Sequence, residues 1–252
     1  MELYLITGFL GAGKTTFLKN FARQFAGRRL RLIINEFGRA GVDGTLLREL
    51  DAALDEISNG SIFCACRLDQ FEAALEQAAA DAPDVVLVEA SGLADPTNVR
   101  RVLAQFPAVS YQGSVCVADA ARLEKVFSTA RACPRQLAVS SLVLLNKTDL
   151  ATEAQCAEAK ALILRANPAA RIRRTQFGRF EPEWLSLIVP DVDEVLDMPD
   201  ITLQKAVLQI RPTMPFAALQ KCLVQLAGET WRIKGFVRVP GGIFYVDCTG
   251  PE

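Results

Sequence analysis

A glycine-rich segment near the start of the chain has the composition of a phosphate-binding loop. Residues 8–15 read GFLGAGKT, which matches the pattern GxxxxGK followed by Ser or Thr. Glycines allow the backbone to wrap a phosphate with its N–H groups pointing inward; the lysine can reach the β- and γ-phosphates, and the hydroxyl can hold Mg²⁺. The expected phosphate contacts are Gly8, Gly11, Ala12, Gly13, Lys14, Thr15 and Thr16.

A second motif, NKTD at residues 146–149, directly follows the apolar run LVLL. The carboxylate of Asp149 can accept two N–H bonds from the N1/N2 edge of guanine, where adenine has no matching donors. Asn146 can meet the base at N7 and O6, and the stem of Lys147 can lie along its face. Ligands of open α/β sheets bind at the carboxyl ends of the strands, where both motifs fall. The two motifs together predict GTP rather than ATP as the nucleotide.

Acidic residues after two further apolar runs fit the same site. Glu89 ends one run and can hold a Mg²⁺ water, while the N–H of Gly92 can sense the γ-phosphate. Glu36 and Asp43 follow another run and can bind Mg²⁺ or position the attacking water; the other interpretation of all three acids is a solvated loop. Both segments are candidate switches ordered by the γ-phosphate. The expected catalytic residues are Lys14, Glu36 and Glu89, and the expected Mg²⁺ ligands are Thr15, Glu36, Asp43 and Glu89.

The chain has seven cysteines and no histidine. Serine or cysteine catalysis with a histidine partner, and a His-ligated zinc, are therefore excluded. Cys64 and Cys66 lie two residues apart, so on an extended segment they point the same way and can chelate one soft ion. Four-coordinate zinc needs two more ligands, either from Glu36 and Asp43 or from the same cysteine pair of a second chain. The alternative is that both are plain small residues under a loop, as the other, widely spaced cysteines are expected to be structural.

The elements that must position these groups follow from the apolar pattern. Short runs rich in Val, Ile and Leu alternate with longer amphipathic segments, which predicts a mostly parallel sheet flanked by helices. The expected strands are Leu3–Thr7, Leu32–Asn35, Val85–Glu89, Ser114–Asp119 and Leu142–Asn146. The expected helices are Thr15–Phe25, Asp69–Ala82, Thr97–Gln105 and Glu153–Ala166. The fold class is thus α/β, a P-loop nucleotide-binding fold.

A change in amino-acid composition divides the chain. The stretch from Pro182 to Pro199 is proline-rich and acidic and is typical of a linker. After it, the pattern predicts a strand (Thr202–Ile210), a helix (Phe216–Ala227) and two strands (Thr230–Val239 and Ile243–Cys248), a small β-α-β-β subdomain. We therefore expect a nucleotide-binding domain at 1–190, a linker at 191–200 and the subdomain at 201–252.

Composition limits the partners. The net charge is −1 over 252 residues, which argues against holding nucleic acid by bulk electrostatics. No apolar run approaches the roughly 18–20 residues needed to span a bilayer, and the start of the chain lacks the basic region of a secretory signal. A cytoplasmic protein without nucleic-acid or membrane partners is expected.

Six segments, in this order, carry a family resemblance: GFLGAGKTT, INEFG, SNG followed by a cysteine pair, VEASGLADP, LLNKTDL and WRIKGF. They resemble the CobW-type family of P-loop GTPases, relatives of the hydrogenase and urease nickel-insertion GTPases. The resemblance implies a SIMIBI-class GTPase fold, Mg²⁺-dependent GTP hydrolysis, and delivery of a metal or metallocofactor to a client protein. It also implies that residues 201–252 correspond to the C-terminal domain of the family.

The chain departs from the family pattern at the metal motif. The family has CxCC after an Asn-Gly pair; here Ser61 and Phe63 replace two of the cysteines, Cys64 stays in register and Cys66 is additional. The C-terminal segment is also short, so an open sheet edge could pair with a second copy or a client strand. Two functions remain open: a GTPase that carries Zn, Co or Ni on the cysteine pair, and a GTP-gated docking protein that remodels a cofactor–protein complex, such as a corrinoid complex, without binding a metal ion.

Overall fold

The computed structural model describes residues 1–35, 52–57, 68–190, 214–229 and 233–248 of the 252-residue chain. Contacts divide the chain into two compact units, Met1–Thr202 and Leu203–Glu252, and each is described by itself. Four of the predicted metal-site residues lie outside the described residues: Glu36, Asp43, Cys64 and Cys66.

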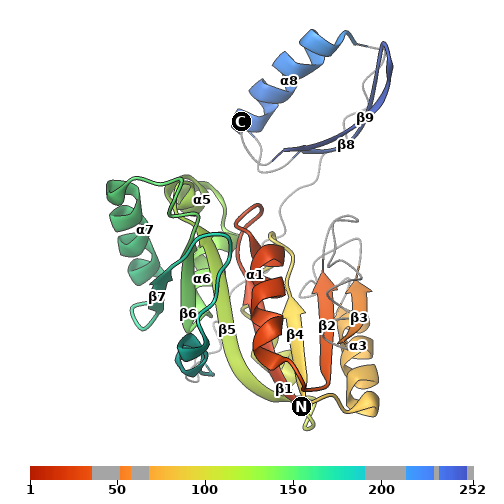
Figure 1. The fold of residues 1–252 in the computed structure, drawn as a ribbon, viewed down its shortest axis with the longest axis vertical. Coiled ribbons are helices and arrows are strands. Elements are labelled where there is room, and N and C mark those ends of the chain that lie inside the picture. The colour runs from red at the N-terminus through yellow and green to blue at the C-terminus, as the bar shows by residue number, and fades with distance from the viewer. Residues whose placement is uncertain (36–51, 58–67, 191–213, 230–232, 249–252) are drawn as a thin grey trace. The chain divides into compact units, whose positions relative to one another are not determined.

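In its described part, the first unit is built on a seven-stranded sheet in the order β3-β2-β4-β1-β5-β6-β7 (Figure 1). Each strand pairs with its neighbours in parallel, which confirms the predicted sheet type. The strands are Glu2–Thr7 (β1), Leu30–Asn35 (β2), Ala52–Ile57 (β3), Val85–Glu89 (β4), Ser110–Asp119 (β5), Leu142–Asn146 (β6) and Arg171–Arg174 (β7).

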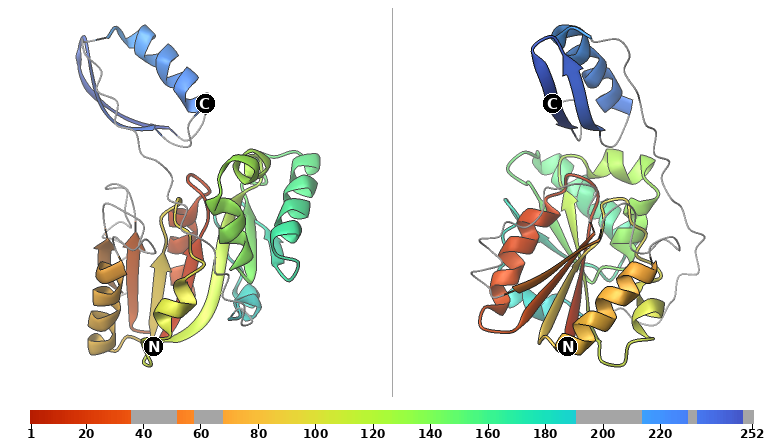
Figure 2. Two further views of the ribbon diagram at one scale, coloured as in Figure 1. Left: turned by 180° about the vertical axis from the view of Figure 1, so that it is seen from behind. Right: turned by 90° about the vertical axis from the view of Figure 1, so that its right-hand side faces the viewer.

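Helices cover both faces of this sheet, as Figure 2 shows for α1 and α3 on opposite sides. Because successive strand side chains point to opposite faces, β1 feeds two cores. Tyr4 and Ile6 join the cluster under α1, and Leu3 and Leu5 join the cluster under α3. The helices are Lys14–Ala22 (α1), Leu68–Asp81 (α3), Val99–Leu103 (α4), Leu123–Thr129 (α5), Ala132–Ala138 (α6) and Glu153–Ala166 (α7), with 3₁₀ turns at Arg23–Phe25 (η1) and Pro182–Leu187 (η2).

The first half of the proline-rich, acidic stretch that begins at Pro182 packs within the first unit. Trp184 of η2 stacks edge-on against Phe180 with ring centroids 5.8 Å apart, and Phe180 contacts Phe21 of α1 at 4.8 Å. Ile188 is buried in the same cluster. Although the composition from Pro182 onward is typical of a linker, the apolar residues between the prolines dock on the α1 face, inside the bounds of 1–190 that the sequence predicts for the first domain.

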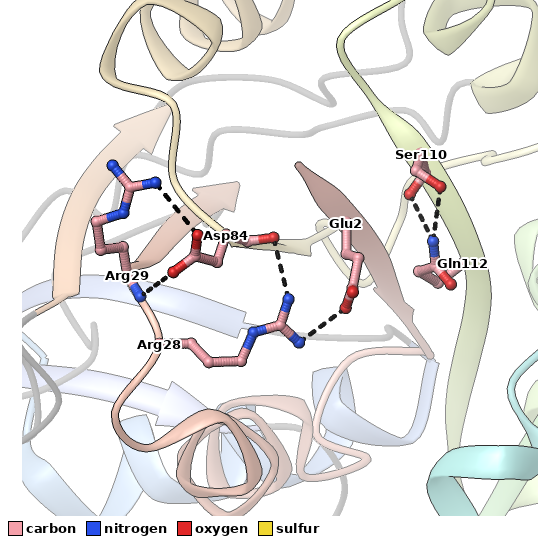
Figure 3. Close-up of polar contacts among 6 residues, drawn as sticks. All are labelled: Glu2, Arg28, Arg29, Asp84, Ser110 and Gln112. Atoms are coloured by element: carbon pink, nitrogen blue, oxygen red, sulfur yellow. Dashed lines mark hydrogen bonds and ion pairs between the residues drawn. The ribbon is translucent and has the colours of Figure 1, made fainter.

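The edge of the sheet where the strands begin, at their amino ends, carries exposed ion pairs (Figure 3). The guanidinium of Arg28 donates to Glu2 at 2.9 Å and to the carbonyl of Asp84 at 3.5 Å. Asp84 accepts from the backbone N–H of Arg29 at 2.9 Å and from its guanidinium at 3.2 Å, and these bonds hold the pKa of Asp84 below its usual value. Polar contacts thus tie β1 to the residues that precede β2 and β4.

The described part of the second unit consists of Phe216–Glu229 (α8) and an antiparallel pair, Ile233–Val239 (β8) and Gly242–Cys248 (β9). These match the helix and two strands predicted there; the strand expected at Thr202–Ile210 lies outside the described residues. Across the described ranges of both units, no helix combines the length and apolarity required to cross a membrane.

Candidate functional site

The loop between β1 and α1 has a backbone that demands glycine. Gly8, Gly11 and Gly13 have φ of 132°, 73° and 100°, a region that other residues rarely adopt. A Cβ on Gly8 would lie 2.2 Å from the carbonyl oxygen of Val117, and one on Gly13 would lie 2.6 Å from Nδ2 of Asn146. The glycines of the motif thus let the loop curl tightly at the amino end of α1, where backbone N–H groups favour an anion.

Two groups predicted to act together at the phosphates lie in contact. The hydroxyl of Thr15 donates to Oε1 of Glu89 across 3.2 Å, and Glu89 is only 3% exposed at the end of β4. Hydroxyl and carboxylate oxygens are the hard donors that Mg²⁺ prefers, so this pair fits a magnesium ion. Lys14 is buried, and its ammonium donates to the carbonyl of Phe9 at 3.4 Å, within the loop itself.

The segment after Glu89 packs directly against the phosphate loop. A Cβ on Gly92 would lie 2.6 Å from Cδ2 and 2.7 Å from the backbone nitrogen of Leu10. The carbonyl of Gly92 accepts from Nε2 of Gln136 at 3.1 Å, and that of Ala94 accepts from the same nitrogen at 2.9 Å. Helix α6, which was not predicted, therefore holds this candidate switch segment in place.

Asn146 joins two loops at the end of β6. The side chain is 2% exposed; its Nδ2 donates to the carbonyl of Ala12 at 2.9 Å, and its Oδ1 accepts from the N–H of Gly178 at 3.1 Å. The amide thus connects the phosphate loop to residues 175–178. That Asn146 also meets the guanine base stays a prediction.

The rest of the NKTD motif lies at the surface beside this connection. Lys147 has a φ of 59°, and its ammonium pairs with the carboxylate of Asp119 at 2.8 Å. Thr148 donates from its hydroxyl and its N–H to the carbonyl of Thr175, at 3.1 and 3.3 Å, and Asp149 is exposed. Sequence reasoning did not single out Asp119, although an acid that ends an apolar strand was the signal used for Glu89.

These loops lie at the carboxyl ends of β1, β4 and β6, where a nucleotide-binding domain holds its ligand. A family model described as the CobW/HypB/UreG nucleotide-binding domain matches residues 2–174, which include all of them. The chain belongs to the CobW/HypB/UreG family.

Curated relatives agree with membership in the CobW/HypB/UreG family. The zinc chaperone CobW of Pseudomonas aeruginosa is 32% identical over 206 residues, 68% of this chain and 55% of that protein. The zinc chaperone YjiA of Escherichia coli is 29% identical over 161 residues, 60% of this chain and 50% of that protein. A zinc-regulated GTPase metalloprotein activator of Schizosaccharomyces pombe is 27% identical over 207 residues, which are 77% of this chain and 48% of that protein. This chain spans about half the length of these relatives.

Solved structures of the CobW/HypB/UreG family share the fold. Zn(II)-bound YjiA GTPase from E. coli superposes with a TM-score of 0.56 at 19% identity, covering 100% of this chain and 87% of that one. The hydrogenase maturation factor HypB from Archaeoglobus fulgidus gives a TM-score of 0.51 at 22% identity, covering 74% of this chain and 87% of that one. At these identities the likeness is one of fold.

Cysteines of the described residues are placed in the interior or in the second unit. Cys116, Cys133 and Cys156 are buried, and burial raises the pKa of Cys116 to about 12. No group of three or more His, Cys, Asp or Glu that could hold a metal occurs within the described ranges. The structural role expected for these three thiols agrees with their burial, whereas the cysteine pair at 64 and 66 lies outside the described residues.

Proposed function

We propose that this chain is a Mg²⁺-dependent GTP-binding and GTP-hydrolysing switch that delivers a metal or metallocofactor to a client metalloprotein. One observation supports the proposal most strongly: the contact between Thr15 and Glu89 lies beside a glycine-rich phosphate loop, and Asn146, the first residue of the NKTD motif, is hydrogen-bonded to that loop. A phosphate cradle, a hard-oxygen pair and a guanine-type motif thus converge on one edge of the sheet.

The residues of the chain have separate tasks in this proposal. Lys14 and the N–H groups of residues 11–15 hold the phosphates, and Asp149 selects guanine through its carboxylate. Mg²⁺, when bound, neutralises charge on the β- and γ-phosphates. Thr15 and Glu89 hold the ion, with Glu36 and Asp43 proposed as further ligands or as the group that orients water. We expect slow intrinsic turnover, on the order of 10⁻⁴ to 10⁻² per second, as in GTPases that await a partner.

The cargo is proposed from the relatives, whose names include zinc chaperones and a zinc-regulated metalloprotein activator. Cys64 and Cys66 are the proposed thiolate ligands for Zn, with Co or Ni as other soft candidates. The second candidate function, a GTP-gated docking protein that binds no ion, is favoured by the reduced cysteine motif, in which Ser61 and Phe63 stand where the family has cysteine. A cytoplasmic location and a homodimer remain proposals.

Phosphate release from GTP tests the enzyme proposal. The wild-type chain with Mg²⁺ should release phosphate slowly, and Lys14→Ala should abolish GTP binding or turnover because it removes the positive charge at the phosphates. Lys125→Ala, on helix α5, is the control and should leave turnover unchanged. Wild-type hydrolysis by Lys14→Ala would rule out this site as the catalytic one.

Metal competition separates the two functions. Zn²⁺, Co²⁺ and Ni²⁺ are titrated against a chromophoric chelator, with GDP and then with a non-hydrolysable GTP analogue. Tight binding that requires Cys64 and Cys66, is lost in the double serine variant and changes with the nucleotide supports a metallochaperone. Affinity weaker than micromolar in both nucleotide states would favour the docking protein.

A further inference from the structure

Backbone strain is concentrated at the carboxyl ends of β6 and β7. Three non-glycine residues among those described have positive φ: Ala82 at 47°, Lys147 at 59° and Phe177 at 54°. Ala82 follows the last residue of α3 and donates its N–H to the carbonyl of Ala78, the usual way for a helix to end. The other two belong to neighbouring strand ends at the candidate nucleotide site.

Phe177 occupies a turn that ordinarily excludes it. The N–H of Arg179 donates to the carbonyl of Gln176 at 3.1 Å, and Phe177 and Gly178 between them both have positive φ, the pattern of a type I′ turn. The first central position of such turns is dominated by Asn, Asp and Gly. The ring of Phe177 is also 64% exposed, so core packing does not compensate for the strain.

The rest of the structure fixes this turn against the guanine-type motif. Nδ2 of Asn20, on α1, donates to the carbonyls of Phe177 and Gly178 at 3.1 and 2.9 Å. The N–H of Gly178 donates to Oδ1 of Asn146 at 3.1 Å. Thr148 donates to the carbonyl of Thr175 just before the turn. These bonds hold the backbone of the turn beside Asn146 and Thr148, and Phe177 lies exposed on that turn.

We propose that Phe177 is a base-contact residue of the nucleotide site, whose ring packs against the purine of a bound guanine nucleotide. Backbone strain that the surroundings enforce is a mark of functional positions, and aromatic rings add affinity to any base through its π-face. Phe177 would thus supply affinity, whereas Asp149 supplies the choice of guanine. This inference rests on the proposed function, because it requires that GTP binds at this edge of the sheet.

The test uses Phe177→Asn in the full chain. Asparagine suits the turn, so the nucleotide-free variant should melt about 2–4 °C higher than the wild type. Its dissociation constant for GDP carrying a fluorophore on the ribose should nevertheless rise about 10-fold. Phe177→Trp should bind within about 2-fold of the wild type, and its added tryptophan emission should change when GDP is added. Phe236→Ala is the matched control, since this phenylalanine of β8 is 78% exposed.

Two results would overturn the inference, and they are distinguishable. If Phe177→Asn binds GDP as tightly as the wild type, the ring does not contact the base, although the proposed nucleotide site stands. If the wild type binds no GDP, or binds it as tightly when Lys14 is replaced by alanine, the proposed function itself fails and the inference fails with it.

Discussion

Asn146 is the residue on which the phosphate loop and the guanine-type motif depend together. Its amide satisfies a buried carbonyl of the phosphate loop and the N–H of Gly178 with one side chain. A shorter side chain would not reach these two backbone groups. A charged side chain could not both donate one hydrogen bond and accept the other in this geometry. Positioning of the nucleotide loops is therefore part of the role of Asn146, whichever contacts it makes with a base.

Asn146→Ala should lower the free energy of unfolding by about 2–4 kcal/mol, because two buried backbone groups lose their partner. It should also weaken GDP binding, since the phosphate loop loses an anchor at Ala12. Urea denaturation and GDP titration measure the two effects. Asn167→Ala is the control: this buried asparagine donates to the carbonyls of Leu137, Ala138 and Ser140, away from the site. Equal losses of GDP affinity in both variants would contradict the role given to Asn146.

At the scale of elements, helix α6 and the segment after β4 act as one support for the phosphate loop. Gln136 donates to two carbonyls of that segment, Arg135 forms an ion pair with Asp95, and Gly92 lies against Leu10. Only a residue without a Cβ fits at position 92, because the facing atoms include the backbone of Leu10. The close approach of two loops thus explains the glycine in the motif ASGLADP.

Gly92→Ala should displace the phosphate loop and weaken GDP binding about 10-fold, with a loss of about 1–3 kcal/mol of stability from overpacking. Fluorescent GDP titration and thermal unfolding measure both. Gly228→Ala in α8 is a matched control, because a Cβ there meets nothing within 4 Å. The account of this segment is wrong if Gly92→Ala leaves GDP affinity unchanged.

The elements differ in how well the sequence predicts them. Strands β1, β4 and β6 are buried along nearly their whole length, so their apolar runs identify them. The apolar pattern does not identify the edge strands β3 (AALDEI) and β7 (RIRR), because they carry charged residues that pair with distant partners: Asp55 of β3 with the buried Arg31 of β2, and Arg174 of β7 with Glu153. Arg174 is an exposed residue at the end of β7. Long-range contacts of this kind leave no local spacing pattern.

The same limit applies to the site. Motif spacing predicts Gly8, Lys14, Thr15, Glu89 and Asp149 as site residues, since a chemical task sets the type of each residue. It did not point to Gln136 of α6, which donates to Gly92 from 44 residues along the chain, or to the turn after β7, where Gly178 donates to Asn146 from 32 residues away. Their contribution depends on which elements become neighbours, and the sheet order alone decides that.

In the first unit as a whole, the candidate nucleotide site and the exposed ion pairs of Arg28 and Asp84 lie at opposite edges of the sheet. Strand β1 begins beside the ion pairs of Arg28 and Asp84 and ends at the phosphate loop. Substitutions at the amino-terminal edge should therefore change stability without changing nucleotide binding. Substitutions in the loops at the carboxyl edge should change nucleotide binding, with or without a change in stability.

Asp84→Asn tests this separation through its pH dependence. The pKa of Asp84 is lowered in the folded state by bonds from Arg29, so the carboxylate contributes stability above its usual value of 3.8. That contribution is lost as pH falls through the lowered pKa, so the unfolding free energies of variant and wild type should begin to converge as pH falls below about 4. Denaturation at several pH values measures it, with GDP affinity expected to stay the same. A constant difference at every pH would contradict the assignment.

The central claim is tested most directly by measuring how Asp149 sets the nucleotide preference. Calorimetric titration gives the affinities for GDP, ADP and xanthosine diphosphate. The wild type should bind GDP far more tightly than the other two, because only guanine offers both N–H donors to the carboxylate. Asp149→Asn should lose GDP affinity and prefer xanthosine diphosphate, whose oxygen accepts from the new amide. Unchanged preference for GDP in this variant, or equal binding of ADP by the wild type, would contradict a guanine-nucleotide switch at this edge of the sheet.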